Sequence, residues 1–104
     1  MIVRVWRGQS AMKDADAYFR HLTDGVFPSL KGIPGHRGAE VLRWETISGV
    51  EFLVMTYWES LSAIREFAGP DAETAVVSTE ARALLSEFDS VVRHYELAHD
   101  STHR

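Results

Sequence analysis

Five side chains in this sequence could together line a binding site. Phe52, Val54, Thr56 and Trp58 alternate along one predicted strand, so they point to one face of a sheet. Phe67 follows them on the next predicted helix. Arg7 lies near the end of the first predicted strand, and Tyr95 lies in the last one. If Val3 and Val5 face the helices, Arg7 shares their face and ends near the mouth of a pocket. A substrate-binding set is therefore predicted, listed here in full: Arg7, Thr56, Trp58, Phe67 and Tyr95.

Each of these residues also has a purely structural explanation. Arg7 could extend from the end of its strand into solvent, as arginine often does. Aromatic residues at regular spacing usually belong to a hydrophobic core, and core alone is the better explanation for Phe52. For Trp58 and Phe67 we favour core residues that also form a pocket wall. Because His94 alternates with Tyr95, only one of the two can face the pocket, and Tyr95 is our choice because it is in phase with Val91 and Leu97.

Other kinds of site have little support in the sequence. The histidines are scattered, and the only pair at the i, i+4 spacing that a zinc site on a helix uses is His99 and His103, in the polar tail. We expect His21 to be solvated and His36 to be exposed in a turn, or else to lie over the pocket. There is no Ser-His-Asp pattern, phosphate loop or carboxylate pair, so we predict no metal and assign no catalytic residue.

The composition is typical of one globular domain. It does not indicate a strongly charged partner. The chain has 104 residues, a formal net charge of −4 and no cysteine. These values argue against nucleic acid as a partner and exclude disulfides and cysteine nucleophiles. Arg4 and Arg7 interrupt the first residues, which therefore form neither a signal peptide nor a membrane span. We expect a cytoplasmic protein with one domain over residues 1–98 and a polar tail over residues 99–104.

The predicted elements alternate between strands and helices. Strands are expected over residues 1–8, 37–45, 50–58 and 91–97. A first helix capped by Ser10 carries an apolar stripe as far as Val26, and a second one, capped by Ser60, ends at Gly69. Two short helical turns are expected near residues 72–76 and 81–88. The order β-α-β-β-α-β predicts a ferredoxin-like α+β fold, with a four-stranded antiparallel sheet and the helices on one face.

The second face of that sheet is predicted to be apolar. Trp6, Leu53, Met55 and also Trp44 are assigned to it, since Phe52 and its alternates face the helices. Exposure of such an apolar face to solvent is unfavourable. We therefore expect a homodimer in which the two sheets pack against each other.

Four segments resemble those of a known family, the antibiotic biosynthesis monooxygenase-like proteins of the dimeric α+β barrel superfamily. They are "MIVRVWRG", "GIPGHRGAEVLR", "FLVMTYWESLSAIREFAG" and "VVRHYEL", and the likeness covers residues 1–98. The family includes cofactor-independent oxygenases of polycyclic phenols, haem-degrading enzymes and proteins of unknown activity. The resemblance implies a homodimer with a small-molecule pocket between helices and sheet in each subunit.

The resemblance also indicates which family activity to expect. Where the haem-degrading members have Asn, Trp and His, this sequence has Arg7, Phe67 and Val77. Valine cannot be an axial haem ligand, so haem degradation is not expected. The expectation is a cofactor-independent monooxygenase acting on a small aromatic or polyketide-like substrate. The alternatives are a non-catalytic small-molecule-binding or stress-related module of the same fold, or a non-oxidative isomerase or decarboxylase.

Overall fold

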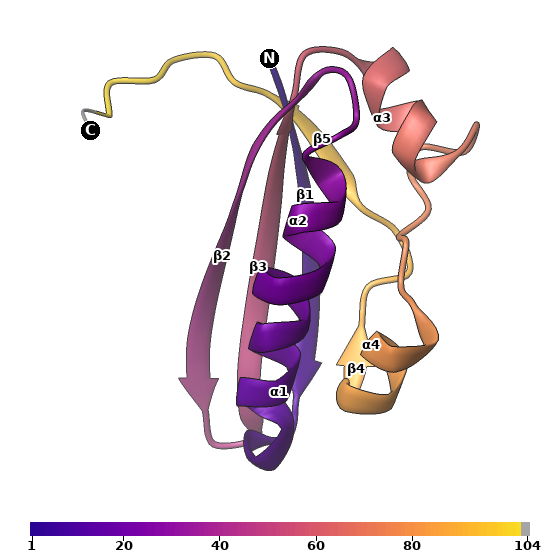
Figure 1. The fold of residues 1–104 in the computed structure, drawn as a ribbon. Helices are drawn as coiled ribbons and strands as arrows, with labels where there is room; N and C mark the ends of the chain where they lie inside the picture. Colours follow the sequence, from indigo (N-terminus) through magenta and orange to yellow (C-terminus); the bar gives the residue numbers. More distant parts are fainter. Residues whose placement is uncertain (103–104) are drawn as a thin grey trace.

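A single antiparallel sheet forms one layer of the molecule (Figure 1). The computed structural model describes residues 1–102, so His103 and the end of the predicted tail lie outside the described residues. The strands are β1 (Ile2–Ser10), β2 (His36–Thr46), β3 (Gly49–Trp58), β4 (Glu87–Phe88) and β5 (Arg93–Glu96). They follow the order β2-β3-β1, and both β4 and β5 pair with the far side of β1. The ferredoxin-like prediction is confirmed, with the fourth strand position divided between two short strands.

One continuous helical segment covers a face of this sheet (Figure 1). It consists of the 3-10 turn η1 (Met12–Asp14), α1 (Ala15–Arg20), the π-helical turn η2 (His21–Val26) and α2 (Phe27–Leu30). The predicted cap by Ser10 is wrong, because Ser10 still pairs with Val50 as the last residue of β1. The helix therefore begins later, and the buried Ser10 hydroxyl has no hydrogen-bond partner among residues 1–102.

Two shorter helices follow β3. In α3 (Leu61–Ala68) the Ser60 hydroxyl accepts a hydrogen bond from the Ala63 amide at 3.2 Å, which confirms the predicted cap. This helix ends at Gly69, whose φ of 89° suits glycine. Ser78 caps α4 (Thr79–Leu84) in the same way. The helical turn predicted near residues 72–76 is absent. Those residues run as an irregular linker held by a bridge between Thr74 and Val91.

The strand register decides which side chains face the helices. Arg4 lies opposite Thr56 and Trp6 opposite Val54, and residues opposite each other in neighbouring strands share a face. The helix-facing core forms two clusters, one around Tyr18, Leu22 and Phe52 and another around Leu30, Trp58 and Ile64. The prediction that Trp6 lies on the second face is therefore wrong, since Trp6 packs beneath the helices.

The second sheet face carries Leu53 and Met55, as predicted, and Trp44 joins them because it lies opposite Glu51 on β3. Trp44 is 65% exposed and Leu42, which lies opposite Leu53, is 51% exposed. No helix covers this face in residues 1–102 (Figure 1). Within the same residues, no helix is both long and apolar enough to cross a membrane.

Candidate functional site

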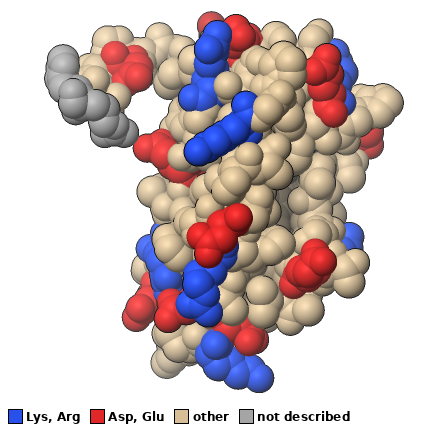
Figure 2. Space-filling view, viewed as in Figure 1, with Lys and Arg blue, Asp and Glu red and all other residues tan. Residues whose placement is uncertain are grey.

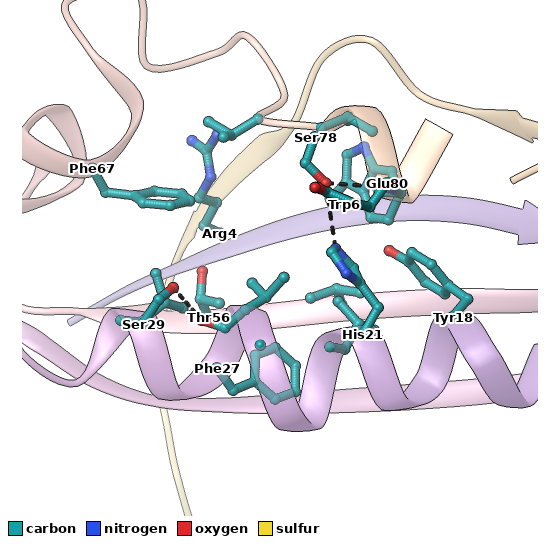
Figure 3. Close-up of a pocket in the computed structure, with 18 of the residues that line it drawn as sticks. Arg4, Trp6, Tyr18, His21, Phe27, Ser29, Thr56, Phe67, Ser78 and Glu80 are labelled. Carbon is teal, nitrogen blue, oxygen red and sulfur yellow. Dashed lines mark hydrogen bonds between the residues drawn. The ribbon is translucent and has the colours of Figure 1, made fainter. Parts of the chain in front are cut away.

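A cavity of about 300 Å³ lies between the sheet and the helices. Its floor is β1 and β3, one wall is the segment from α1 to α2, and the other is the linker with the start of α4 (Figure 3). In Figure 2 the surface between these two walls is mostly uncharged, with acidic and basic side chains around it. The lining is predominantly apolar: Trp6, Leu22, Val26, Phe27, Leu30, Val54, Phe67, Val76, Val77, Ala81 and Val92.

Arg4 is the one cation in the described part of the chain that lines this cavity. Only 5% of the Arg4 surface is exposed to solvent. Nη1 donates to the Ala72 carbonyl at 2.5 Å and contacts Nε2 of His94 at 3.0 Å, while Nη2 donates to the Thr74 carbonyl at 3.0 Å. The guanidinium also lies 5.7 Å from the centre of the Phe67 ring. Arg4 thus ties the linker to the sheet and presents a positive charge beside the apolar walls (Figure 3).

The charge of Arg4 is not neutralised by contact with a carboxylate. Its three hydrogen-bond partners are neutral, and no acidic group in residues 1–102 lies within 4.0 Å of its nitrogens. Burial lowers the pKa of Arg4, and the more distant charge of Glu73 opposes that effect. Arginine nevertheless stays protonated in proteins. A buried cation without a paired anion is unfavourable, so this end of the cavity would stabilise an anionic ligand.

Polar groups also occupy the other end of the cavity, where Tyr18 and His21 from the helical segment face Ser78 and Glu80 (Figure 3). The Nε2 of His21 lies 3.5 Å from the Ser78 hydroxyl, and its ring stacks on Tyr18 with the centroids 6.0 Å apart. Burial raises the pKa of Tyr18, so its hydroxyl stays protonated at neutral pH. This end therefore offers a neutral hydroxyl donor, an imidazole and a carboxylate.

Three of the five predicted site residues lie at or next to this cavity. Thr56 and Phe67 line it. Trp58 is fully buried behind them, where it stacks on Phe67 at 5.7 Å and donates from Nε1 to the Thr56 hydroxyl at 2.8 Å. Trp58 is thus a core residue that supports the wall without lining it. A role for Thr56 or Phe67 in binding remains a prediction.

Arg7 and Tyr95 lie on the other face of the sheet, so their predicted placement in the pocket is wrong. Arg7 is opposite Leu53, and its Nε bonds Glu51 at 2.6 Å while Nη2 bonds Glu87 at 3.1 Å. The hydrogen bond with Glu51, which has the larger effect, and the hydrogen bond with Glu87 raise the pKa of Arg7. Tyr95 lies opposite Val3 and is half-exposed. The premise that Val3 and Val5 face the helices assigned the side chains of β1 to the wrong faces of the sheet. In the observed register His94, and not Tyr95, lies beside Arg4.

Arg4, Tyr18 and His21 were missed as site residues. The position of Arg4 between the apolar residues Val3 and Val5 was the available signal, because burying an arginine requires a special environment. His21 was expected in solvent, since it falls off the apolar stripe of the helix. His21 lies one helical turn beyond Tyr18, on the side of the segment that lines the cavity. The apolar stripe alone does not indicate how far the cavity extends beside it.

Similarity to solved structures identifies the fold of this chain. No family model matches the chain, and no curated protein matches it by sequence. Solved structures do match over nearly the whole chain. A Bacillus cereus protein described as an antibiotic biosynthesis monooxygenase has a TM-score of 0.66 at 15% identity, covering 100% of this chain and 97% of its own. The haem-degrading MhuD of Mycobacterium tuberculosis, with two haems in its active site, gives 0.64 at 16% identity, with coverage of 98% and 100%.

A third match is a monooxygenase of Streptomyces coelicolor bound to nanaomycin D. Its TM-score is 0.59 at 19% identity, and the match covers 97% of this chain and 92% of the other. At these identities the comparisons establish that the chain has the α+β fold of antibiotic biosynthesis monooxygenase structures. That fold carries both monooxygenases and haem degraders, so its chemistry has to be argued from the cavity.

Haem fits the cavity poorly. A volume of about 300 Å³ is at the lower limit for ligand pockets. Val77, which stands at the position of the haem ligand in the family resemblance, lines the wall and has no donor atom. Among residues 1–102, His21 is the one imidazole on the cavity lining. Elsewhere, no cluster of three or more histidine and acidic residues suited to a metal occurs in residues 1–102.

Proposed function

We propose that this cavity binds a small, mainly aromatic organic anion, and that the protein is a cofactor-independent monooxygenase of the antibiotic biosynthesis type. The buried charge of Arg4 carries the proposal. Arg4 is 5% exposed, has no carboxylate in contact within residues 1–102, and lies at the edge of an apolar cavity. An anionic ligand would supply the missing countercharge, and apolar walls would favour its ring system.

The reaction would use electrons from the substrate itself. In a phenolic substrate with an acidic CH₂ group, loss of a proton gives a carbanion that can reduce dioxygen. One oxygen atom then replaces the two hydrogens as a carbonyl and the other leaves as water, so that CH₂ and O₂ become C=O and H₂O. The part of the protein would be electrostatic, with Arg4 stabilising the anion. Trp6 and Phe67 would hold the ring plane, and the apolar lining would reduce contact of the ring with water.

A binding protein without catalysis is the alternative, because it needs the same cavity and the same cation. The hydrogen bonds of Arg4 to Ala72 and Thr74 favour it, since they give Arg4 a structural role that exists without any reaction. An isomerase or decarboxylase on this scaffold would also bind an anion but would consume no oxygen. Only turnover separates these functions.

A cytoplasmic location also remains a prediction.

The test combines binding with oxygen consumption. We expect 2-naphthoate to bind the native protein with one site per subunit, and 9-anthrone to be oxidised to the quinone with uptake of one O₂. Arg4→Met should weaken naphthoate binding by roughly 10- to 100-fold, the value of a charged hydrogen bond. Arg7→Met is the matched control, since Arg7 lies on the same strand but on the opposite face. Equal losses in both variants would contradict the assignment of Arg4, and binding without oxygen uptake would favour the non-catalytic alternative.

We also propose that the partner of the second sheet face is another copy of this chain. Leu42 and Trp44 are more than half-exposed there, beside Leu53 and Met55. A face of this composition is typical of an interface. Because the same patch would meet itself, a two-fold dimer would cover it in both subunits.

A further inference from the structure

We propose that Tyr18 donates a hydrogen bond to an oxygen atom of the ligand, so that the ligand is a flat anion with a second polar group at the end away from Arg4. The inference rests on the proposed function, because it assumes that Arg4 binds the anionic end. It adds the identity of the group at the opposite end of the cavity.

The Tyr18 hydroxyl opens to the cavity and has no hydrogen-bond partner among residues 1–102. Tyr18 is only 2% exposed, yet its hydroxyl makes no hydrogen bond within residues 1–102, although the residue lines the cavity. Its ring is fixed by edge-on packing against Phe52, with the centroids 4.9 Å apart. In Figure 3 the hydroxyl points away from the helix toward the cavity side. A hydroxyl donor on a largely apolar cavity wall, without a partner in the protein, is available to a ligand that enters the cavity.

The ring positions give the approximate shape of the ligand. Arg4 and Trp6 are two residues apart on one strand face, roughly 7 Å along β1. The Trp6 and Tyr18 rings follow with their centroids 6.4 Å apart. The cation and the hydroxyl therefore stand at opposite ends of an apolar floor, as Figure 3 shows. A body of two or three fused rings spans such a floor, whereas a single ring with one charged group would leave Tyr18 unpaired.

The experiment compares two probes that differ by one oxygen atom. 2-Naphthoate carries only the anionic group, and 6-hydroxy-2-naphthoate adds a hydroxyl at the far end. In the native protein the added hydroxyl should tighten binding roughly 3- to 10-fold, the value of one neutral hydrogen bond. In Tyr18→Phe this gain should vanish, so that the two probes bind with equal affinity. Tyr95→Phe is the matched control, because Tyr95 lies on the other sheet face, and it should keep the gain.

The outcomes separate this inference from the proposed function. If 2-naphthoate binds through Arg4 but the hydroxyl adds nothing, or if its gain survives in Tyr18→Phe, the role of Tyr18 is wrong and the proposed function stands. If neither probe binds, both fail. Misfolding is checked directly. Tyr18→Phe removes no internal hydrogen bond, so its unfolding midpoint should not fall below that of the native protein.

Discussion

Nη1 of Arg4 lies 3.0 Å from Nε2 of His94, and this contact fixes the state of the imidazole. A guanidinium can only donate, so Nε2 must accept and the ring proton of the neutral His94 is on Nδ1. Burial lowers the pKa of His94 and the charge of Arg4 lowers it further, while Glu73 opposes both. Protonation of His94 would remove the acceptor and place two cations side by side.

Stability should therefore fall in mild acid. The folded pKa of His94 lies below the unfolded value of about 6.5, so the unfolded chain takes up a proton first as the pH drops. The contribution of His94 is complete above that value and is lost as the pH falls from it through the folded pKa. His36, whose pKa burial also lowers, acts in the same direction.

Denaturant unfolding between pH 7.5 and 5 measures this slope. In His94→Gln the part due to His94 should disappear, because glutamine can accept from Arg4 without titrating. His99→Gln, in the exposed tail, is the control and should leave the slope unchanged. A native protein whose stability is flat or rises toward pH 5 would contradict the expected sign.

Trp58 should affect folding more than binding. It is fully buried and does not line the cavity. Trp58→Ala should lower the free energy of unfolding by about 3–5 kcal/mol because it leaves a large hole. Trp58→Phe keeps most of the ring but loses the bond to Thr56, and should cost about 1–3 kcal/mol. Naphthoate affinity of the folded Trp58→Phe protein should stay within about threefold of the native value. A larger loss would show that Trp58 contacts the ligand.

The sequence predicted the elements well because their signals are local. The alternation in residues 50–58, the cap at Ser60 and the stop at Gly69 each act within a few residues of where they are read. The phase of β1 was harder. Val3 and Val5 on one face and Ile2 and Trp6 on the other are apolar alike, so alternation alone could not choose the helix-facing side. Pairing with β3 decides it, and that pairing is a tertiary contact.

The same limit explains the errors in the site. Arg7 and Tyr95 were assigned by the phase chosen for their strands, and a shift of one residue moves every side chain to the opposite face. Thr56 was assigned to the helix-facing side because Glu51 fixed the phase of β3, and it lines the cavity. The neutral surroundings of Arg4 come from Ala72, Thr74 and His94, which are distant in sequence and meet only in the fold.

The second sheet face predicts a dimer in solution. Leu53→Lys should dissociate it, since the new charge would be buried at the centre of the proposed interface. Light scattering at micromolar concentration should give twice the chain mass for the native protein and a lower mass for the variant. Ile47→Lys is the control, because Ile47 is fully exposed at the turn between β2 and β3. A native protein that is monomeric under these conditions would rule out the interface.

Haemin should bind only weakly and without a defined stoichiometry. The cavity is small, and Val77 provides no ligand atom. Titration should therefore give a broad Soret change that does not saturate at one equivalent per subunit. A sharp band at one equivalent would contradict this expectation. Its loss in His21→Ala, but not in His99→Ala, would then identify His21 as the ligand.

The π-helical turn η2 lets the cavity wall hold one residue more than a regular helix would. His21–Val26 holds more residues per turn than an α-helix, and the segment continues as α2 on the other side. Deleting Gly25, whose position has open space around it, would let the turn close as an ordinary α-helix. Because each α-helical residue turns the chain by about 100° and each π-helical residue turns it by less, the shortened turn would cover nearly the same angle. Phe27 and Leu30 would therefore stay on the side of Tyr18 and His21, so a single-codon deletion at this turn would leave both halves of the wall facing one ligand.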